Sequence, residues 1–169
     1  MSSHLHSQGK HALELAVELP SSMYPLSKIL EKLKQGEVPT GIHPHMNGNF
    51  VFRNAVIRFG EVIKETLKAH NLSASDLDLF IPHQANLRIS QFIQKRMKLS
   101  DDQVFNNIQS KGNTTAASIP IALSEAWEQG KLKRGDKVLL AAFGSGFTWG
   151  SVIMRCLLYT SPSPRDGLL

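Results

Sequence analysis

Apolar residues recur at three- and four-residue spacing in three stretches of the chain, and this spacing predicts three amphipathic helices. The first covers residues 52–67, and the second covers residues 88–97. The third begins at Thr114 or Thr115, either of which can cap a helix, and it runs to Gln129. The second helix would turn Ile89, Phe92, Ile93 and Met97 inward, and the third would bury Ile119, Leu123, Ala126 and Trp127.

Shorter apolar runs bounded by turn residues predict strands. Residues 77–81 form one strand, residues 104–108 form a second, and the nearly continuous apolar run 138–143 forms a third that is buried on both faces. Residues 147–155 run back as its hairpin partner, and residues 12–19 predict a further strand. Helices and strands alternate from the first long helix onward. This order predicts an α/β fold with a mixed, mostly parallel sheet and packed helices.

The same pattern divides the chain into three parts. Residues 1–48 form an N-terminal strand and a loop excursion with a short helical piece at 26–34, and residues 49–155 form the core. Residues 156–169, CLLYTSPSPRDGLL, hold two Ser-Pro pairs and no helical stripe, so they predict a tail outside the fold. A non-native appendage is the favoured interpretation of this tail, and a flexible native segment is the alternative.

Composition narrows the function classes. The chain of 169 residues is 41% hydrophobic and 20% charged, as expected of a soluble globular domain, and it has no apolar run long enough to span a membrane. Cys156 is the single cysteine, which excludes an internal disulfide and favours a reducing compartment, so we expect a cytoplasmic protein. The pairs His4-x-His6 and His43-x-His45 lack a third ligand at metal-site spacing. The formal charge of +5 comes without an aromatic-interleaved basic stripe, so nucleic acid is not favoured either.

Three turns follow the three central strands. His83 follows the first strand, Asn113 the second, and Gly144-Ser145-Gly146 the third. Carboxyl ends of neighbouring parallel strands meet at one edge of a sheet, where α/β folds bind ligands. An imidazole and a carboxamide can each donate a hydrogen bond to a carbonyl oxygen, and a glycine-bounded turn offers backbone N–H groups. Each motif alone is more often structural, but together they suggest stabilisation of an oxyanion or enolate.

The motifs in this order resemble a known family. Residues 82–89 read PHQANLRI, residues 112–118 read GNTTAAS, and residues 142–150 read AFGSGFTWG. Met46-Asn47-Gly48-Asn49 with Phe52 adds a looser match. In these residues the chain resembles the C-terminal half of a 3-oxoacyl-[acyl-carrier-protein] synthase III, over roughly residues 1–155.

The resemblance implies a thiolase-like fold of two similar halves in a homodimer. The implied reaction is a decarboxylating Claisen condensation of an acyl-CoA primer, acetyl-CoA by expectation, with malonyl-acyl carrier protein. No cofactor is implied beyond these two thioester substrates. His83 and Asn113 match the residues that bind the malonyl thioester oxygen and stabilise the enolate. The backbone N–H of Ser145 matches the oxyanion hole, and Phe143 would line the site.

Two further sets of residues take their expected roles from the same resemblance. The first set matches the channel for the pantetheine arm and consists of Gly48, Phe52, Asn86 and Ile89. The second set matches a basic surface that receives the acidic carrier protein and consists of Arg53, Arg88, Lys95 and Arg96. A basic rim of this kind attracts an acidic partner at low salt.

The sequence departs from the family at the nucleophile. The family takes its acyl group on a Cys of the N-terminal half, whereas Cys156 follows the last predicted strand. We therefore expect a fragment that is inactive in condensation by itself. A non-catalytic half that binds the carrier protein or a partner subunit is one alternative, and another condensing or acyl-transfer enzyme of the thiolase superfamily is a second. A hydrolase is not favoured, because there is no Gly-x-Ser-x-Gly elbow.

Overall fold

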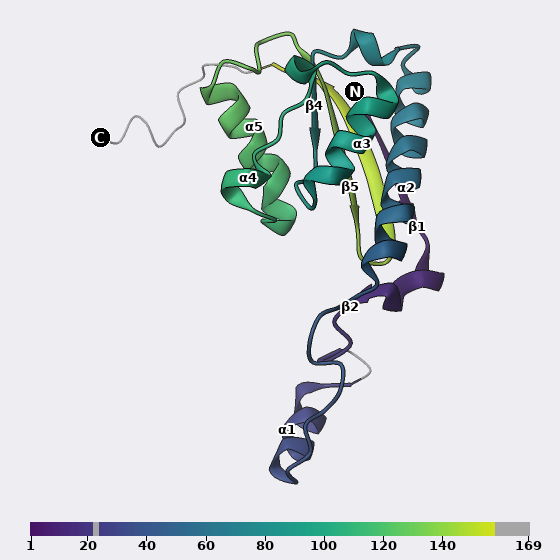
Figure 1. Cartoon of the computed structure of the whole chain (residues 1–169), viewed down its shortest axis with the longest axis vertical. Helices are drawn as coiled ribbons and strands as arrows, with labels where there is room; N and C mark the ends of the chain where they lie inside the picture. Colours follow the sequence, from purple (N-terminus) through teal and green to yellow (C-terminus); the bar gives the residue numbers. More distant parts are fainter. Residues whose placement is uncertain (22–23, 158–169) are drawn as a thin grey trace, which may run out of the picture.

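A computed structural model describes residues 1–21 and 24–157, and its centre is a four-stranded mixed sheet (Figure 1). The strand order is β1-β6-β5-β4, where β4 and β5 are parallel and the other two pairs are antiparallel. A parallel bridge between Phe80 and Val104 adds the beginning of another strand. The strands are β1 Ser2–Ser7, β4 Leu79–Pro82, β5 Lys137–Gly144 and β6 Thr148–Arg155.

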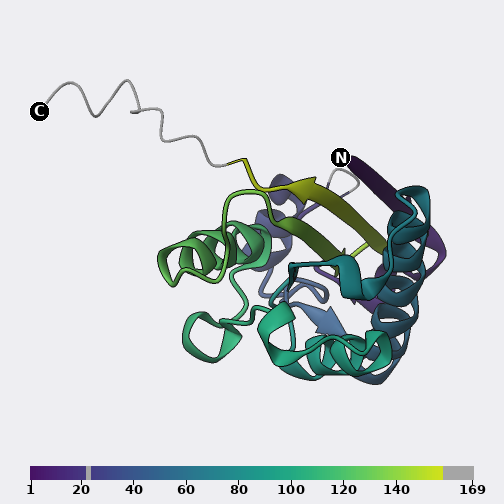
Figure 2. The ribbon, with the colours of Figure 1, turned by 90° about the horizontal axis from the view of Figure 1, so that it is seen from above.

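Helices cover both faces of this sheet (Figure 2). Successive residues of a strand point to opposite faces, so β5 contributes to two cores. Leu139 and Phe143 pack with α2, Gly48–Ala69, and α3, Leu87–Met97. Val138 packs on the other face with α5, Ser118–Glu128. The shorter helices are α1 Leu26–Lys34 and α4 Ile108–Lys111, and the 3₁₀ turns are Gly9–Glu14, Ala74–Asp76, Asp101–Gln103 and Thr115–Ala117.

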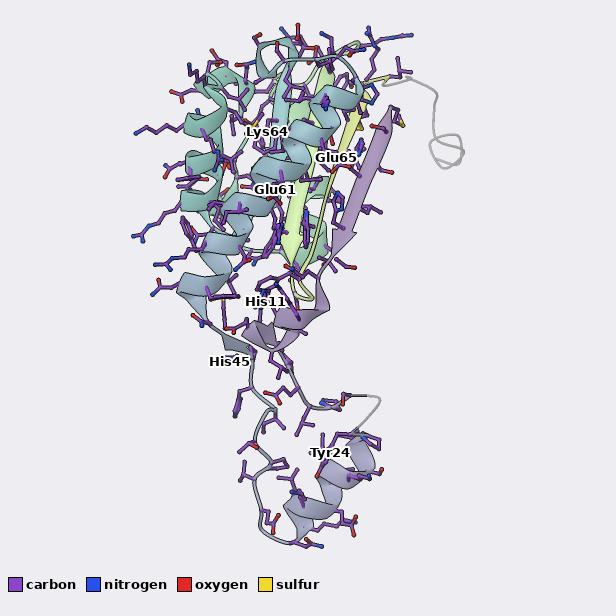
Figure 3. All side chains as sticks on the ribbon, turned by 90° about the vertical axis from the view of Figure 1, so that its right-hand side faces the viewer. His11, Tyr24, His45, Glu61, Lys64 and Glu65 are labelled. Atoms are coloured by element: carbon purple, nitrogen blue, oxygen red, sulfur yellow. The ribbon has the colours of Figure 1, made fainter. Side chains whose placement is uncertain are left out.

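An arm extends away from the sheet and carries α1 at its far end (Figures 1 and 3). Its base is a two-stranded sheet of β2, Leu15–Ala16, and β3, His45–Met46. The arm meets the core where the N–H of Asn47 donates to the carbonyl of Glu14 at 2.9 Å. Asn47 also caps α2, because its side chain accepts from the N–H of Phe50. The arm therefore ends where the longest helix begins.

Glu65 of α2 fastens the edge strand β1 to the body of the fold (Figure 3). Its two carboxylate oxygens lie 2.7 Å from Nε2 of His6 and 3.0 Å from Nδ1 of His4. These hydrogen bonds lower the pKa of Glu65, and the one to His6 has the larger effect.

The described residues contain no group of three or more His, Cys, Asp or Glu side chains arranged to hold a metal ion. No helix in the same residues is long and apolar enough to cross a membrane.

Most of the predicted core elements are confirmed. The first amphipathic helix lies within α2, the helical piece at 26–34 coincides with α1, and the hairpin of residues 138–155 is β5 and β6. The α/β class and the mixed sheet with packed helices are confirmed as well. The division into residues 1–48, 49–155 and 156–169 stays a prediction. Most of its third part, residues 158–169, lies outside the described residues.

Two strand predictions were wrong or too long. Only Leu15–Ala16 of residues 12–19 pairs as a strand, because its partner β3 is two residues long and ends where Asn47 caps α2. Of residues 104–108, Val104 alone bridges to β4. The chain then turns away because the side chain of Gln84 binds the N–H groups of Asn107 and Ile108.

Two aromatic side chains predicted as buried are exposed instead. Phe92 is 43% exposed and Trp127 is 44% exposed. Each lies one position from the residue that faces the core, and adjacent residues of a helix point about 100° apart. Ile93 takes the inward position on α3, and Ala126 takes it on α5. The buried stripe of α5 is thus made of small residues, which lets this helix lie close to the sheet.

Candidate active site

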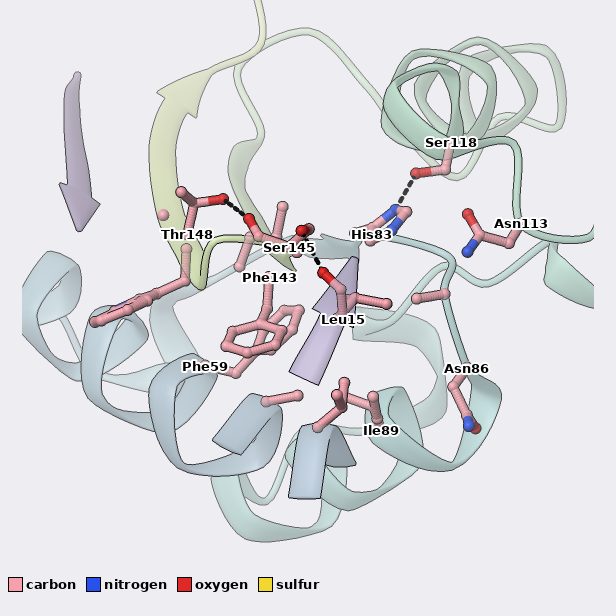
Figure 4. Close-up of a pocket in the computed structure, with 18 of the residues that line it drawn as sticks. Leu15, Phe59, His83, Asn86, Ile89, Asn113, Ser118, Phe143, Ser145 and Thr148 are labelled. Carbon is pink, nitrogen blue, oxygen red and sulfur yellow. Dashed lines mark hydrogen bonds between the residues drawn. The ribbon is translucent and has the colours of Figure 1, made fainter. Parts of the chain in front are cut away.

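One cleft of about 1460 Å³ opens beside the carboxyl ends of β4 and β5 (Figure 4). The first turns of α2, α3 and α5 contribute further walls, together with the beginning of β6 and two residues of β1, Leu5 and His6. It is larger than the ~300–1000 Å³ of typical small-molecule sites, so it has room for an elongated ligand. Every residue predicted from the sequence as catalytic, oxyanion-hole, lining or channel residue borders it: His83, Asn113, Ser145, Phe143, Gly48, Phe52, Asn86 and Ile89.

The backbone of the sheet places His83 in the cleft. The parallel ladder pairs Pro82 with Ala141, and the N–H of His83 extends it by donating to the carbonyl of Ala141 at 2.8 Å. The imidazole is half-buried, and its Nδ1 lies 2.6 Å from Oγ of Ser118 (Figure 4). Burial lowers the pKa of His83, because a charged imidazolium loses solvation there. A neutral ring with one N–H is therefore the resident form near neutral pH.

Asn113 lies on the other side of the same corner, with its side chain directed toward His83 (Figure 4). Its Oδ1 accepts a hydrogen bond from the N–H of Thr115 at 2.9 Å. The side chain of Asn113 thus bonds the backbone two residues further along, a local turn that asparagine commonly forms. This bond fixes the orientation of the carboxamide. The side-chain NH₂ of Asn113 is then the end that remains for a ligand.

The glycine turn forms the opposite wall. Gly146 has a φ of 134°, and a Cβ there would stand 2.8 Å from Cγ2 of Thr148, so the turn requires glycine. Ser145 donates its hydroxyl to the carbonyl of Leu15 at 2.5 Å, which ties the turn to the base of the arm. Phe143 is buried, with its ring 4.9 Å from that of Phe147. The oxyanion-hole role of the Ser145 N–H stays a prediction.

Gln84 holds the loops of the site together, a role that the sequence pattern did not indicate. It is 3% exposed, and its Nε2 donates to the carbonyl of Pro82 at 2.7 Å. Its Oε1 accepts from the N–H groups of Asn107 and Ile108 at 3.1 and 3.2 Å. One amide thus connects the His83 turn to the segment that leads to Asn113. A glutamine beside the histidine was the only signal in the sequence.

Three of the predicted channel residues only line the cleft, whereas the fourth also caps a helix. Gly48 is the first residue of α2, and Phe52 and Ile89 are half-buried apolar residues on the cleft wall. Asn86 borders the cleft but also caps α3, because its Oδ1 accepts from the N–H of Arg88 at 2.9 Å. A structural role therefore accounts for Asn86 without any ligand.

The predicted docking residues are exposed on the two neighbouring helices α2 and α3. Arg88 borders the cleft, whereas Arg53, Lys95 and Arg96 lie outside it. Cys156 is 5% exposed in the core against α5 and does not border the cleft. The single thiol of this chain is thus separate from His83 and Asn113.

Known proteins share this arrangement of sequence and fold. The family model for the C-terminal part of 3-oxoacyl-[acyl-carrier-protein (ACP)] synthase III matches residues 67–156, more than half of the chain. The chain belongs to the 3-oxoacyl-ACP synthase III family. The fold is accordingly the thiolase-like α/β fold that the sequence resemblance implied.

Individual members of the 3-oxoacyl-ACP synthase III family agree with this placement. A beta-ketoacyl-[acyl-carrier-protein] synthase III of Campylobacter jejuni is 50% identical over 110 residues, which cover 65% of this chain and 34% of that protein. One of Pseudoalteromonas atlantica is 40% identical and covers 92% of this chain and 45% of its own length. The crystal structure of a Thermus thermophilus synthase III matches with a TM-score of 0.79 at 34% identity, covering 92% of this chain and 45% of that one. The chain therefore spans less than half the length of these relatives.

The lowered pKa of His83 predicts a pH dependence of stability. As the pH falls below about 6.5, the unfolded chain binds a proton at His83 before the folded chain does, so the free energy of unfolding should decrease. The variant His83→Gln has no such group and should lose less stability between pH 7 and pH 5 on this account. Urea denaturation at a series of pH values measures both slopes. Equal slopes for the two proteins would contradict a lowered pKa at His83.

Proposed function

We propose that this chain binds the malonyl thioester of acyl carrier protein and stabilises the enolate formed when carbon dioxide leaves. The complete reaction is then the condensation of that enolate with an acyl group from coenzyme A, acetyl in the simplest case. The observation that carries this proposal is the meeting of His83 and Asn113 in one cleft, each with a hydrogen-bond donor available. No cofactor beyond the two thioesters is required.

The chemistry needs donors aimed at one oxygen. In decarboxylation the bond between the carboxylate carbon and the α-carbon breaks, and its electron pair moves into the thioester. The product is an enolate with its charge on the former carbonyl oxygen. The N–H of a neutral His83 and the NH₂ of Asn113 stabilise that charge more than they stabilise the neutral carbonyl. The lowered pKa of His83 supports this role, since a neutral imidazole can donate without first losing a proton to the enolate.

The shape of the cleft supports a thioester on a long arm. Phe52 and Ile89 give its entrance an apolar wall, and Gly48 has no atom within 4 Å of the position of a Cβ. A pantetheine arm is long and narrow, with methyl and methylene groups between its hydroxyl, its two amides and its sulfur. We propose that it enters past these residues and places its thioester carbonyl at His83 and Asn113. The N–H of Ser145 would bind the carbonyl of the acyl group that is attacked.

The acyl-bearing nucleophile must come from elsewhere. The enolate carbon attacks an acyl carbonyl, and a thiolate leaves as the new carbon–carbon bond forms. Cys156 is buried in the core against α5, so it cannot hold that acyl group in the cleft. We therefore propose that this chain alone does not catalyse condensation and that a cysteine-bearing polypeptide completes the site.

The position of Cys156 also favours one alternative function. A half-fold without a thiol in its cleft could bind the carrier protein or a partner subunit and do no chemistry. The two functions differ in whether the bound malonyl thioester loses carbon dioxide. The alternative predicts binding of malonyl-acyl carrier protein without release of carbon dioxide in any assembly of the chain.

Substitutions at the two donors test the proposal. His83→Ala and Asn113→Ala should each slow release of carbon dioxide from malonyl-acyl carrier protein by on the order of a hundredfold, the typical loss for one oxyanion donor. The assay uses the chain reconstituted with a cysteine-bearing half of a family member. Asn54→Ala is the matched control, because it removes a carboxamide of α2 that does not border the cleft. An unchanged rate in either donor variant would remove that residue from the mechanism.

The basic residues of α2 and α3 predict salt-dependent docking of the acidic carrier protein. The double variant Arg53→Glu, Lys95→Glu should weaken binding of malonyl-acyl carrier protein on the order of tenfold at low salt and much less at high salt. Lys133→Glu, together with Lys131→Glu, makes the same charge change on the segment before β5 and should have little effect. Calorimetric titration at two salt concentrations measures these affinities. Equal losses in both double variants would exclude this docking surface.

A further inference from the structure

Ser118 contacts the catalytic candidate His83 from a buried position (Figure 4). It is the first residue of α5 and is 2% exposed. Its Oγ lies 2.6 Å from Nδ1 of His83, and the backbone N–H of Gln84 donates to the same oxygen at 3.4 Å. The two residues are 35 positions apart in the chain, so only the fold brings them together.

The hydrogen-bond inventory of Ser118 decides the direction of this contact. A hydroxyl has one proton to donate and two lone pairs that accept. The N–H of Gln84 can only donate, so it occupies a lone pair of Oγ. If Nδ1 of His83 carried a proton, it would also donate to Oγ. The hydroxyl proton of Ser118 would then be buried without an acceptor among the described residues, which is unfavourable.

We propose that Ser118 is a positioning residue, which donates its hydroxyl proton to Nδ1 of His83 and so holds the ring proton on Nε2. Nε2 is the ring nitrogen without a hydrogen-bond partner among the described residues, on a side chain that borders the cleft. The neutral imidazole then presents N–H to a ligand and cannot turn its acceptor nitrogen to the cleft. The catalytic consequence of this geometry rests on the function proposed above.

Two features allow an effect of Ser118 on the His83 ring to be measured apart from an effect on the structure of the turn. The turn at His83 is held independently by the bond of its N–H to Ala141 and by the side chain of Gln84. Burial lowers the pKa of His83, so the ring is neutral and has a definite tautomer to be measured. Loss of the Ser118 hydroxyl should therefore change the imidazole without releasing the turn.

Nitrogen NMR of ¹⁵N-histidine-labelled chain tests the proposal directly, because protonated and unprotonated ring nitrogens have well-separated shifts. The signals of His83 are assigned from their loss in His83→Gln. We expect Nε2 of His83 to carry the proton and Nδ1 to show the shift of an acceptor that receives a hydrogen bond. In Ser118→Ala the Nδ1 signal should move to the position of a free acceptor. Ser118→Thr, which keeps a hydroxyl, should retain the wild-type shift.

Two results would overturn the proposal. One is a proton on Nδ1 of His83 in the wild-type chain, a reading that needs no variant to fold. The other is an Nδ1 shift that is the same in Ser118→Ala and in the wild type while the amide spectrum is native.

The catalytic half of the proposal has a separate readout in the reconstituted decarboxylation assay. Ser118→Ala should lower kcat by about ten- to a hundredfold and leave KM little changed. A loss of this size is typical when a partner that orients a metal-ligating histidine is removed. A native kcat alongside the altered Nδ1 shift would remove Ser118 from the reaction. A native rate in His83→Ala would instead overturn the proposed function and leave the tautomer assignment standing.

Discussion

The parallel pairing of β4 with β5 is the constraint on which the site depends. Four buried residues, Leu79–Pro82, pair in register with Val138–Ala141, and the N–H of His83 continues the ladder. Because parallel strands end at the same edge of a sheet, this register brings His83 to the edge where β5 turns into the hairpin at Gly144–Gly146. If β4 slipped by one residue along β5, every side chain of β4 would change to the other face of the sheet. The side chain of His83 would then no longer share a cleft with the turn after β5.

Buried polar groups then hold the loops that leave this edge. Gln84 satisfies backbone groups of two segments with a single amide, and such networks stabilise a unique arrangement only when every member is paired. The network continues from Asn107 to Glu125 of α5 and on to Lys111 of α4. The hydrogen bond from Lys111, with that from Asn107, lowers the pKa of Glu125. The segment before Asn113 is thereby tied to the same helix that carries Ser118.

The sequence could predict those elements whose pattern lies within a few neighbouring residues. Helix α2 has a regular apolar spacing, the 3₁₀ turns after Ser73 and Ser100 have complete capping boxes, and β5 is a continuous apolar run. Edge strand β1 was missed because its one large apolar residue, Leu5, is 77% exposed and its partner β6 lies at the far end of the chain. The same holds for Ser118, whose contact with His83 has no local pattern. His83 and Asn113 were expected at one edge of the sheet because each follows a strand or turn in a family-specific motif, whereas the hydrogen-bond partners of their side chains needed the fold.

The central claim is that His83 and Asn113 donate to one thioester oxygen. Isotope-edited infrared spectroscopy of a malonyl thioester analogue that cannot lose carbon dioxide, bound to this chain, measures the strength of those bonds at the carbonyl. The account predicts a lower carbonyl stretching frequency in the complex than in water, a partial return toward the value in water in His83→Ala or Asn113→Ala, and a full return in the double variant. A bound carbonyl with the same frequency in the wild type and in the double variant would contradict it.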